Sequence, residues 1–302
     1  MRKKTLFIAG MMACCFVASA QEIFRTWVAD KGDGTYQNPV LYADYSDPDV
    51  CAAGDDFYMT ASSFNCIPGL PILHSNDLVN WSLVNYALPV QEPQEFFDKA
   101  QHGKGVWAPA IRFHNGEFYI YWGDPDYGIY LIKAKDPKGE WSKPVLVKAG
   151  KGMIDPTPLW DEDGKVYLIH AYAGSRSGVN SILVICELNA EGTEVISDPV
   201  MVFDGNDGKN HTVEGPKLYK RILLYICSCR RSCYRLAVGA SFQKYLWSLR
   251  VKDGNGTGKD DGQRSSSGRL GRYEYRGILV CTFPGSGCLW TCYSPESDEV
   301  DQ

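Results

Sequence analysis

The sequence predicts an all-β protein with the architecture of a β-propeller, and three observations lead to this prediction. The chain of 302 residues is rich in aromatic side chains, with 18 Tyr and 8 Trp, and in turn formers, with 30 Gly and 16 Pro. This composition is typical of many short strands joined by turns. A turn-and-strand pattern then recurs three times, with copies that start roughly 50–60 residues apart, which is the length of a four-stranded blade. A β-sandwich is the alternative for short strands at near-regular spacing.

The N-terminal segment, residues 1–20, predicts a secretory signal peptide. Residues 2–4 are basic, residues 5–17 are apolar but too few to span a bilayer, and residues 18–20 read Ala-Ser-Ala. Cleavage is therefore expected before Gln21, and the mature protein is expected to be secreted, periplasmic or extracellular, without a membrane partner. An uncleaved anchor and lipidation at Cys14 are the alternatives.

Each copy of the repeat is a turn followed by a strand of aromatic and β-branched residues, and each follows an apolar strand that contains Asp-Pro or Ala-Pro. The copies are residues 54–62, 115–123 and 163–171, and the strands before them are residues 46–50, 107–111 and 154–158. Because the first strand of every blade lines the central channel, side chains on these preceding strands are expected to converge.

Three acidic residues lie on or near these inner strands: Asp47, Asp155 and, in the string from His211 to Lys217, Glu214. Carboxylates that converge from three blades would repel one another and separate their pKa values. Such a cluster suits general acid–base chemistry on a glycosidic bond. The alternative is that Asp-Pro and Glu-Gly-Pro are turns capped by an acidic side chain.

A set of longer strings, in the right order over residues 36–220, resembles glycoside hydrolase family 43, the five-bladed propeller β-xylosidases and α-L-arabinofuranosidases. The strings are Asn38-Pro-Val-Leu, Ser46-Asp-Pro-Asp, Ser62-Ser-Phe, residues 68–81, Gly105-Val-Trp-Ala-Pro-Ala-Ile, Ile154-Asp-Pro and Val213-Glu-Gly-Pro. The resemblance implies an inverting hydrolase that acts on xylosyl or arabinofuranosyl linkages of hemicellulose oligosaccharides. The partner it implies is a xylo- or arabino-oligosaccharide.

The resemblance also implies roles for individual residues. Asp47 is the expected general base, Glu214 the general acid, and Asp155 the third carboxylate that tunes the pKa of the acid. An inverting pair stands about 6.5–9.5 Å apart. Phe64 and Trp107 resemble the sugar-contacting aromatics of the family, although each taken alone is more often a core residue. No cofactor is needed for the chemistry. A structural calcium is known in the family, but the His-bearing segment associated with it is missing from this chain.

The composition changes near residue 221. Six of the 11 cysteines lie beyond it, all five histidines lie at or before His211, and residues 252–272 are rich in Gly, Ser, Asp and Arg without periodicity. Cys227, Cys229 and Cys233 do not have the spacing or the nearby histidine of a zinc site, so no metal ligands are assigned. The family pattern stops at Arg221.

We interpret residues 222–302 as the product of a shifted reading frame. When the codons from Arg221 onward are written with suitable synonyms and the first base is dropped, the new frame reads EYYYIFAPAGGVATGWQ, which is another blade strand. Residues 262–273 give VNGPHQGGWVDT and residues 274–290 give STGESWFVHFQDRGAY by the same operation. The two hidden copies of the repeat bring the total to five blades. In frame, only about three blades and the start of the fourth are encoded, so residues 21–221 are expected to be the N-terminal part of the catalytic propeller, residues 222–302 a largely non-native tail, and the chain poorly active.

Two classes of function remain for the chain, and a third is excluded. A net charge of −5 argues against a nucleic-acid partner. The acid triad favours a glycosidase. The alternative is a non-catalytic carbohydrate-binding propeller, which would need no such triad.

Overall fold

The computed structural model describes residues 27–65, 67–206 and 212–218, and the backbone of five later strands between residues 224 and 293. The predicted signal peptide, residues 1–20, and the Gly- and Ser-rich stretch after residue 253 lie outside the described residues. The described chain is built from strands and has two four-residue helices, α1 (Gln94–Phe97) and α2 (Gly174–Ser177). Neither of these helices approaches the length needed to cross a membrane.

Three antiparallel sheets of four strands follow one another along the chain, as the sequence predicts. The first contains β1 (Asp49–Ala53), β2 (Asp56–Thr60), β3 (Gly69–Ser75) and β4 (Ser82–Leu88). The second contains β5 (Trp107–His114), β6 (Glu117–Asp124), β7 (Gly128–Ala134) and β8 (Val145–Ala149). The third contains β9 (Met153–Trp160), β10 (Val166–Tyr172), β11 (Ile182–Leu188) and β12 (Val200–Asp204).

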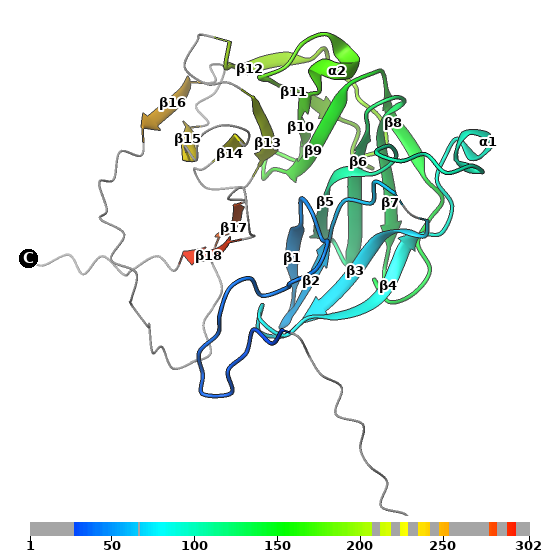
Figure 1. Ribbon diagram of the computed structural model, residues 1–302. Helices are drawn as coiled ribbons and strands as arrows, with labels where there is room; N and C mark the ends of the chain where they lie inside the picture. The colour runs from blue at the N-terminus through cyan, green and yellow to red at the C-terminus, as the bar shows by residue number, and fades with distance from the viewer. Residues whose placement is uncertain are drawn as a thin grey trace, which may run out of the picture.

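The sheets are arranged around a common centre, with the first strand of each innermost (Figure 1). Strand β1 contacts β5, β5 contacts β9, and β9 contacts β13 (Val213–Lys217). Within every sheet the strands pair in chain order, as in an up-and-down meander. This is the arrangement of propeller blades and not of two stacked sheets, so the sandwich alternative is wrong.

The fourth sheet reaches further along the chain than the sequence predicts. Strand β13 pairs with β14 (Leu224–Ser228), which pairs with β15 (Arg235–Ser241) and then β16 (Ser248–Asp253). A separate pair is formed by β17 (Ile278–Thr282) and β18 (Leu289–Tyr293). Ladder hydrogen bonds join backbone groups and therefore demand no particular side chains, so strands can continue past residue 221, where the family-like sequence ends.

The hairpin turns explain why the copies begin as they do. In the second copy Asn115 and Gly116 connect β5 to β6, and His114 pairs with Glu117 across them. Both residues have positive φ, 48° for Asn115 and 79° for Gly116. A two-residue turn with two positive φ angles matches the twist of an antiparallel pair, and Asn-Gly is its preferred sequence.

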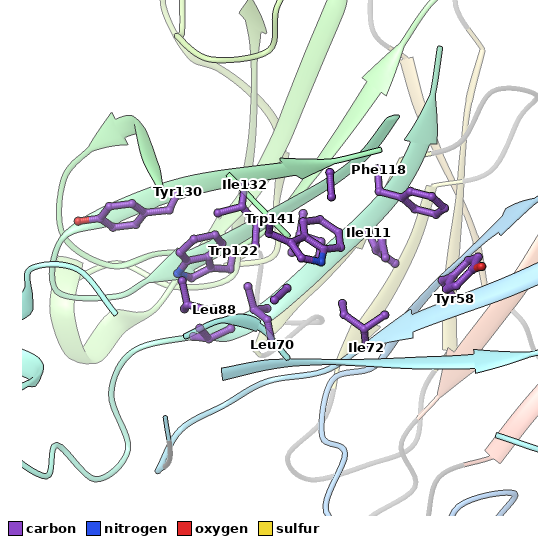
Figure 2. Packing of buried hydrophobic residues seen from close by; sticks show 14 of the residues in the cluster. Tyr58, Leu70, Ile72, Leu88, Ile111, Phe118, Trp122, Tyr130, Ile132 and Trp141 are labelled. Atoms are coloured by element: carbon purple, nitrogen blue, oxygen red, sulfur yellow. The ribbon is translucent and has the colours of Figure 1, made fainter. Parts of the chain in front are cut away.

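The largest core cluster lies between the first and second sheets (Figure 2). Leu70 and Ile72 from β3 pack with Ile111 from β5 and Trp122 from β6, and all four side chains are almost completely buried. The Trp122 ring also stacks on Tyr130 of β7, with centroids 5.5 Å apart. Burial of this apolar area, at about 25 cal/mol per Å², holds neighbouring blades together and so fixes their inner strands relative to each other.

Candidate active site

The same backbone irregularity occurs at the inner strand of every blade. Asp47, Ala108, Asp155 and Gly215 each precede a proline, and their φ angles are 49°, 37°, 55° and 68°. In the second, third and fourth sheets the register shifts at this dipeptide, where two residues of the inner strand oppose one of its neighbour. Proline has no N–H to donate to the ladder, so the dipeptide forms a bulge. A bulge redirects side chains, and here it redirects them at the inner strands.

Positive φ in a residue other than glycine costs of order 1–3 kcal/mol and persists only where the surroundings enforce it. Asp47 and Asp155 occupy matching positions before proline, as the repeat predicts. Glu214 is displaced by one residue, because Gly215 holds the position before proline in the fourth sheet. The general acid candidate therefore reaches the centre from the residue that precedes the bulge.

Asp155 is the most deeply placed of the three acids. Its residue is 8% exposed, and the backbone N–H of Gly215 donates a 2.7 Å hydrogen bond to its Oδ2. The pKa of Asp155 is raised to about 8, mainly by burial and then by the neighbouring carboxylates of Glu214 and Asp47. The three predicted acids are thus brought close enough to interact, and the cluster retains a proton at neutral pH.

The Asp47 carboxylate is oriented by Ser62, which is itself hydrogen-bonded to the second sheet. The Ser62 hydroxyl donates to Asp47 Oδ2 at 2.7 Å, while the Ser62 oxygen accepts a hydrogen bond from the Ala108 backbone N–H at 2.8 Å. Ser62 is thereby committed as a donor toward the carboxylate. Sequence reasoning did not assign Ser62 to the site, although it begins the Ser-Ser-Phe string that contains Phe64.

The two predicted aromatics, Phe64 and Trp107, lie together next to Ser62 and Ala108 in this part of the chain. The rings of Phe64 and Trp107 meet edge to face, with centroids 5.9 Å apart, and Trp107 directly precedes Ala108. The Arg176 guanidinium, from α2, lies 5.5 Å from the centroid of the Trp107 ring and donates from Nε to Asp126 Oδ1 at 3.2 Å. Both rings are only half-buried. The sequence offered no signal for Arg176, because a polar residue in a four-residue helix has no pattern.

A fourth acid, Asp49, is buried at the centre and was not predicted. Asp49 is 3% exposed. Its carboxylate accepts a hydrogen bond from the Ile111 N–H of β5 and forms ion pairs with Arg112 Nη1 of β5 and Lys217 Nζ of β13. Burial opposes ionisation, but the two cations outweigh it and hold the pKa of Asp49 below its ordinary value. Asp49 is therefore a structural carboxylate and is not a proton donor.

Fold and site together define a β-propeller with a proton-retaining carboxylate cluster at its inner strands. Residues 36–233 match the model of Glycosyl hydrolases family 43, and the chain belongs to this family. A beta-xylosidase of Formosa agariphila is 35% identical over 214 residues, which is 68% of this chain and 35% of the relative. A non-reducing end alpha-L-arabinofuranosidase of Bacteroides ovatus is 39% identical over 139 residues, 45% of this chain and 26% of the relative.

Solved structures show the same relationship. A GH43_12 protein from a capybara gut metagenome is 28% identical, with a TM-score of 0.58 over 72% of this chain and 43% of that one. A xylan beta-1,4-xylosidase of Bacillus halodurans is 25% identical, with a TM-score of 0.59 over 75% of this chain and 45% of that one. The chain covers 35% and 26% of the lengths of the two curated relatives named above. The predicted family and fold are confirmed.

Proposed function

We propose that this protein is a glycoside hydrolase that releases xylosyl or arabinofuranosyl units from hemicellulose oligosaccharides with inversion of configuration. The observation that carries the proposal is the cluster of Asp155, Glu214 and Asp47, in which Asp155 is buried and has its pKa raised to about 8. Mutual repulsion among carboxylates is the means by which a glycosidase keeps one carboxyl protonated while another stays ionised. The xylosidase and arabinofuranosidase names of the relatives support the choice of sugar.

In the proposed mechanism Asp47 accepts a proton from the attacking water and Glu214 donates one to the leaving oxygen. The Ser62 hydroxyl bond to Oδ2 fixes the orientation of the Asp47 carboxylate. Asp155 accepts a hydrogen bond from the amide of Gly215 and so holds the backbone that directly follows Glu214. Phe64 and Trp107 support the sugar ring.

No step passes through a metal ion. The part of the chain with described side chains does not gather three or more His, Cys, Asp or Glu residues as metal ligands. The calcium associated with the family is therefore not assigned to residues here.

We also propose that the protein is secreted, periplasmic or extracellular, because residues 1–20 have the three regions of a signal peptide. N-terminal sequencing of the exported protein should begin at Gln21.

The test of activity uses nitrophenyl β-xyloside and nitrophenyl α-L-arabinofuranoside. The chain and a version with the second reading frame restored after codon 221 are both assayed, with Asp47→Asn and Glu214→Gln introduced into the frame-restored version. Each variant should lose roughly 100-fold or more of kcat, as expected when a general acid or base is removed. Asp163→Asn is the matched control, since Asp163 is an acid of the outer turn of the third copy that bonds Lys165 and Tyr167. Its kcat should not change.

The assay also separates the two classes of function. Turnover by the frame-restored protein that Asp47→Asn abolishes supports the hydrolase. Binding of xylobiose without turnover by either version would instead establish a carbohydrate-binding propeller and contradict the proposed function.

A further inference from the structure

We propose that Lys217, anchored on Asp49, is a positioning residue that fixes the strand of the general acid candidate at the centre and opposes the negative charge of the acid cluster. The inference rests on the proposed function for the role of Glu214, but the contacts that carry it do not depend on turnover. Lys217 Nζ lies 3.1 Å from Asp49 Oδ1 and joins β13 of the fourth sheet to β1 of the first. Glu214 lies on the same strand as Lys217.

The bulge explains how both side chains reach the same place. In a regular strand residues three apart point to opposite faces of the sheet. Here Glu214 pairs with position 227 and Lys217 pairs with position 225, so three steps on β13 match two on β14. Partners two apart on one strand share a face, and therefore Glu214 and Lys217 share a face as well. Gly215, with φ of 68°, supplies the backbone conformation that this requires.

Asp49 is a strong anchor because it is buried and shared among three sheets. It lies on β1 and also receives Arg112 Nη1 and the Ile111 N–H from β5. A buried carboxylate needs its charge partners and its hydrogen bonds at the same time, so its contacts tolerate little movement. Lys217 is consequently held in one position, and through three residues of backbone so is Glu214.

The cation also acts on the acids through its charge. Asp155 faces Glu214 from β13, Asp47 from the segment before β1, and Lys217. The two carboxylates raise the pKa of Asp155, whereas the Gly215 amide and the Lys217 ammonium lower it. Among the residues whose side chains are described, Asp49 and Arg112 are further charged groups at this centre, and they pair with each other. Lys217 is thus the cation that limits how far the acid cluster is driven toward protonation.

The test measures the titration of Asp155 in the full chain by carboxyl ¹³C NMR, with the resonance assigned by its absence in Asp155→Asn. In Lys217→Gln, whose amide can still donate to Asp49, the pKa of Asp155 should rise by roughly one unit. In Lys217→Arg, which keeps the charge, it should stay within about 0.3 units of the parent value. Lys165→Gln removes a surface lysine, paired with Glu187, and should leave Asp155 unchanged.

Two further arms keep the inference falsifiable. If Lys217→Gln does not fold, Lys217→Met replaces it, because Asp49 then keeps Arg112 as its ion-pair partner and the Ile111 N–H as its hydrogen-bond donor, and the rise at Asp155 is still expected. An unchanged Asp155 pKa in the neutral variant, or an equal shift in Lys217→Arg, overturns the inference. In the frame-restored protein, Lys217→Gln should lower kcat about tenfold with little change in KM. If Asp155 shifts as expected while no version hydrolyses glycosides, the proposed function fails and the charge effect of Lys217 stands.

Discussion

The backbone amide of Gly215 donates a 2.7 Å hydrogen bond to Oδ2 of Asp155. This bond joins the third sheet to the fourth at the residue that directly follows Glu214. Any change at the Asp155 side chain is therefore transmitted to the backbone that positions the acid candidate. It also means that Asp155 affects the acid in two ways, by its proximity as a carboxyl group and by holding the backbone next to it.

The first prediction concerns Asp155 and the pH dependence of stability. Its pKa is raised from 3.8 to about 8 in the folded protein, because of burial and then the charges of Glu214 and Asp47. The folded state therefore holds a proton that the unfolded state releases, and the stabilisation present below pH 3.8 is lost as pH rises toward 8. Asp155→Asn keeps the acceptor for Gly215 and cannot ionise. Its free energy of unfolding, from urea titrations at pH 5 and pH 8.5, should fall less with pH than that of the parent.

The slope at issue is at most about 1.4 kcal/mol per pH unit for one proton. Equal pH dependence in the parent and in Asp155→Asn would show that this carboxyl titrates normally. It would also remove the main support for a proton-retaining cluster.

The second prediction concerns a buried histidine outside the site. His170 is fully buried on β10, its Nδ1 donates to the Ala171 carbonyl at 3.1 Å, and its Nε2 has no hydrogen-bond partner among the described residues. Burial lowers its pKa to about 4. The neutral ring stabilises the fold above pH 6.5, and that stabilisation is lost as pH falls through 4.

Asn can place an N–H where Nδ1 lies and cannot take up a proton. His170→Asn should thus be less sensitive to acid, with up to roughly 3 kcal/mol less loss between pH 7 and pH 4 than the parent. Thermal melts at several pH values measure the difference. His102→Asn is the control, because His102 is exposed. An identical acid response in the parent and His170→Asn would contradict the prediction.

The third prediction tests the approach of two blades. A Cβ added to Gly123 of β6 would lie 2.7 Å from the carbonyl oxygen of Met153 and 2.8 Å from the Cα of Ile154, both of β9. These are backbone atoms and cannot rotate away. Gly123→Ala should therefore destabilise the fold by about 1–3 kcal/mol or more. Gly139→Ala, whose Cβ would meet atoms at 3.4 Å and beyond, is the matched control and should cost less. Urea unfolding of both variants decides it.

The sequence predicted the parts of the fold that depend on local pattern. The three copies predicted three blades, because turn residues and alternating aromatic strands are specified within a few residues of each other. The Asp-Pro and Ala-Pro strings marked the inner strands, and the structure places the bulges there. Asp47 and Asp155 were found because they precede proline in these strings, and Glu214 because it opens the matching Glu-Gly-Pro string one residue earlier.

The contacts that tie the site together were not predictable in the same way. Asp49 and Lys217 are 168 positions apart, and their ion pair depends on how blades are arranged around the centre. The contact between Ser62 and Asp47 likewise depends on a backbone amide donated by the next sheet. Strands β15 and β16 were missed because backbone pairing does not require a recognisable sequence pattern.

The last prediction concerns the reading frame after Arg221. We expect the nucleotide sequence near codon 221 to carry an inserted or deleted base, so that the second frame continues through EYYYIFAPAGGVATGWQ and the two later copies. The catalytic candidates Asp47, Asp155 and Glu214 are already present in the chain, yet acid–base catalysis needs them held to within about half an ångström. The restored frame supplies blade-type sequence after β13 along the chain, and it supplies a histidine in the segment NGPHQGG. The restored protein should release xylose or arabinose at least 100-fold faster than the chain. Comparable turnover from both proteins would show that the restored sequence after residue 221 is dispensable. A nucleotide sequence whose second frame does not encode these segments would contradict the frameshift hypothesis itself.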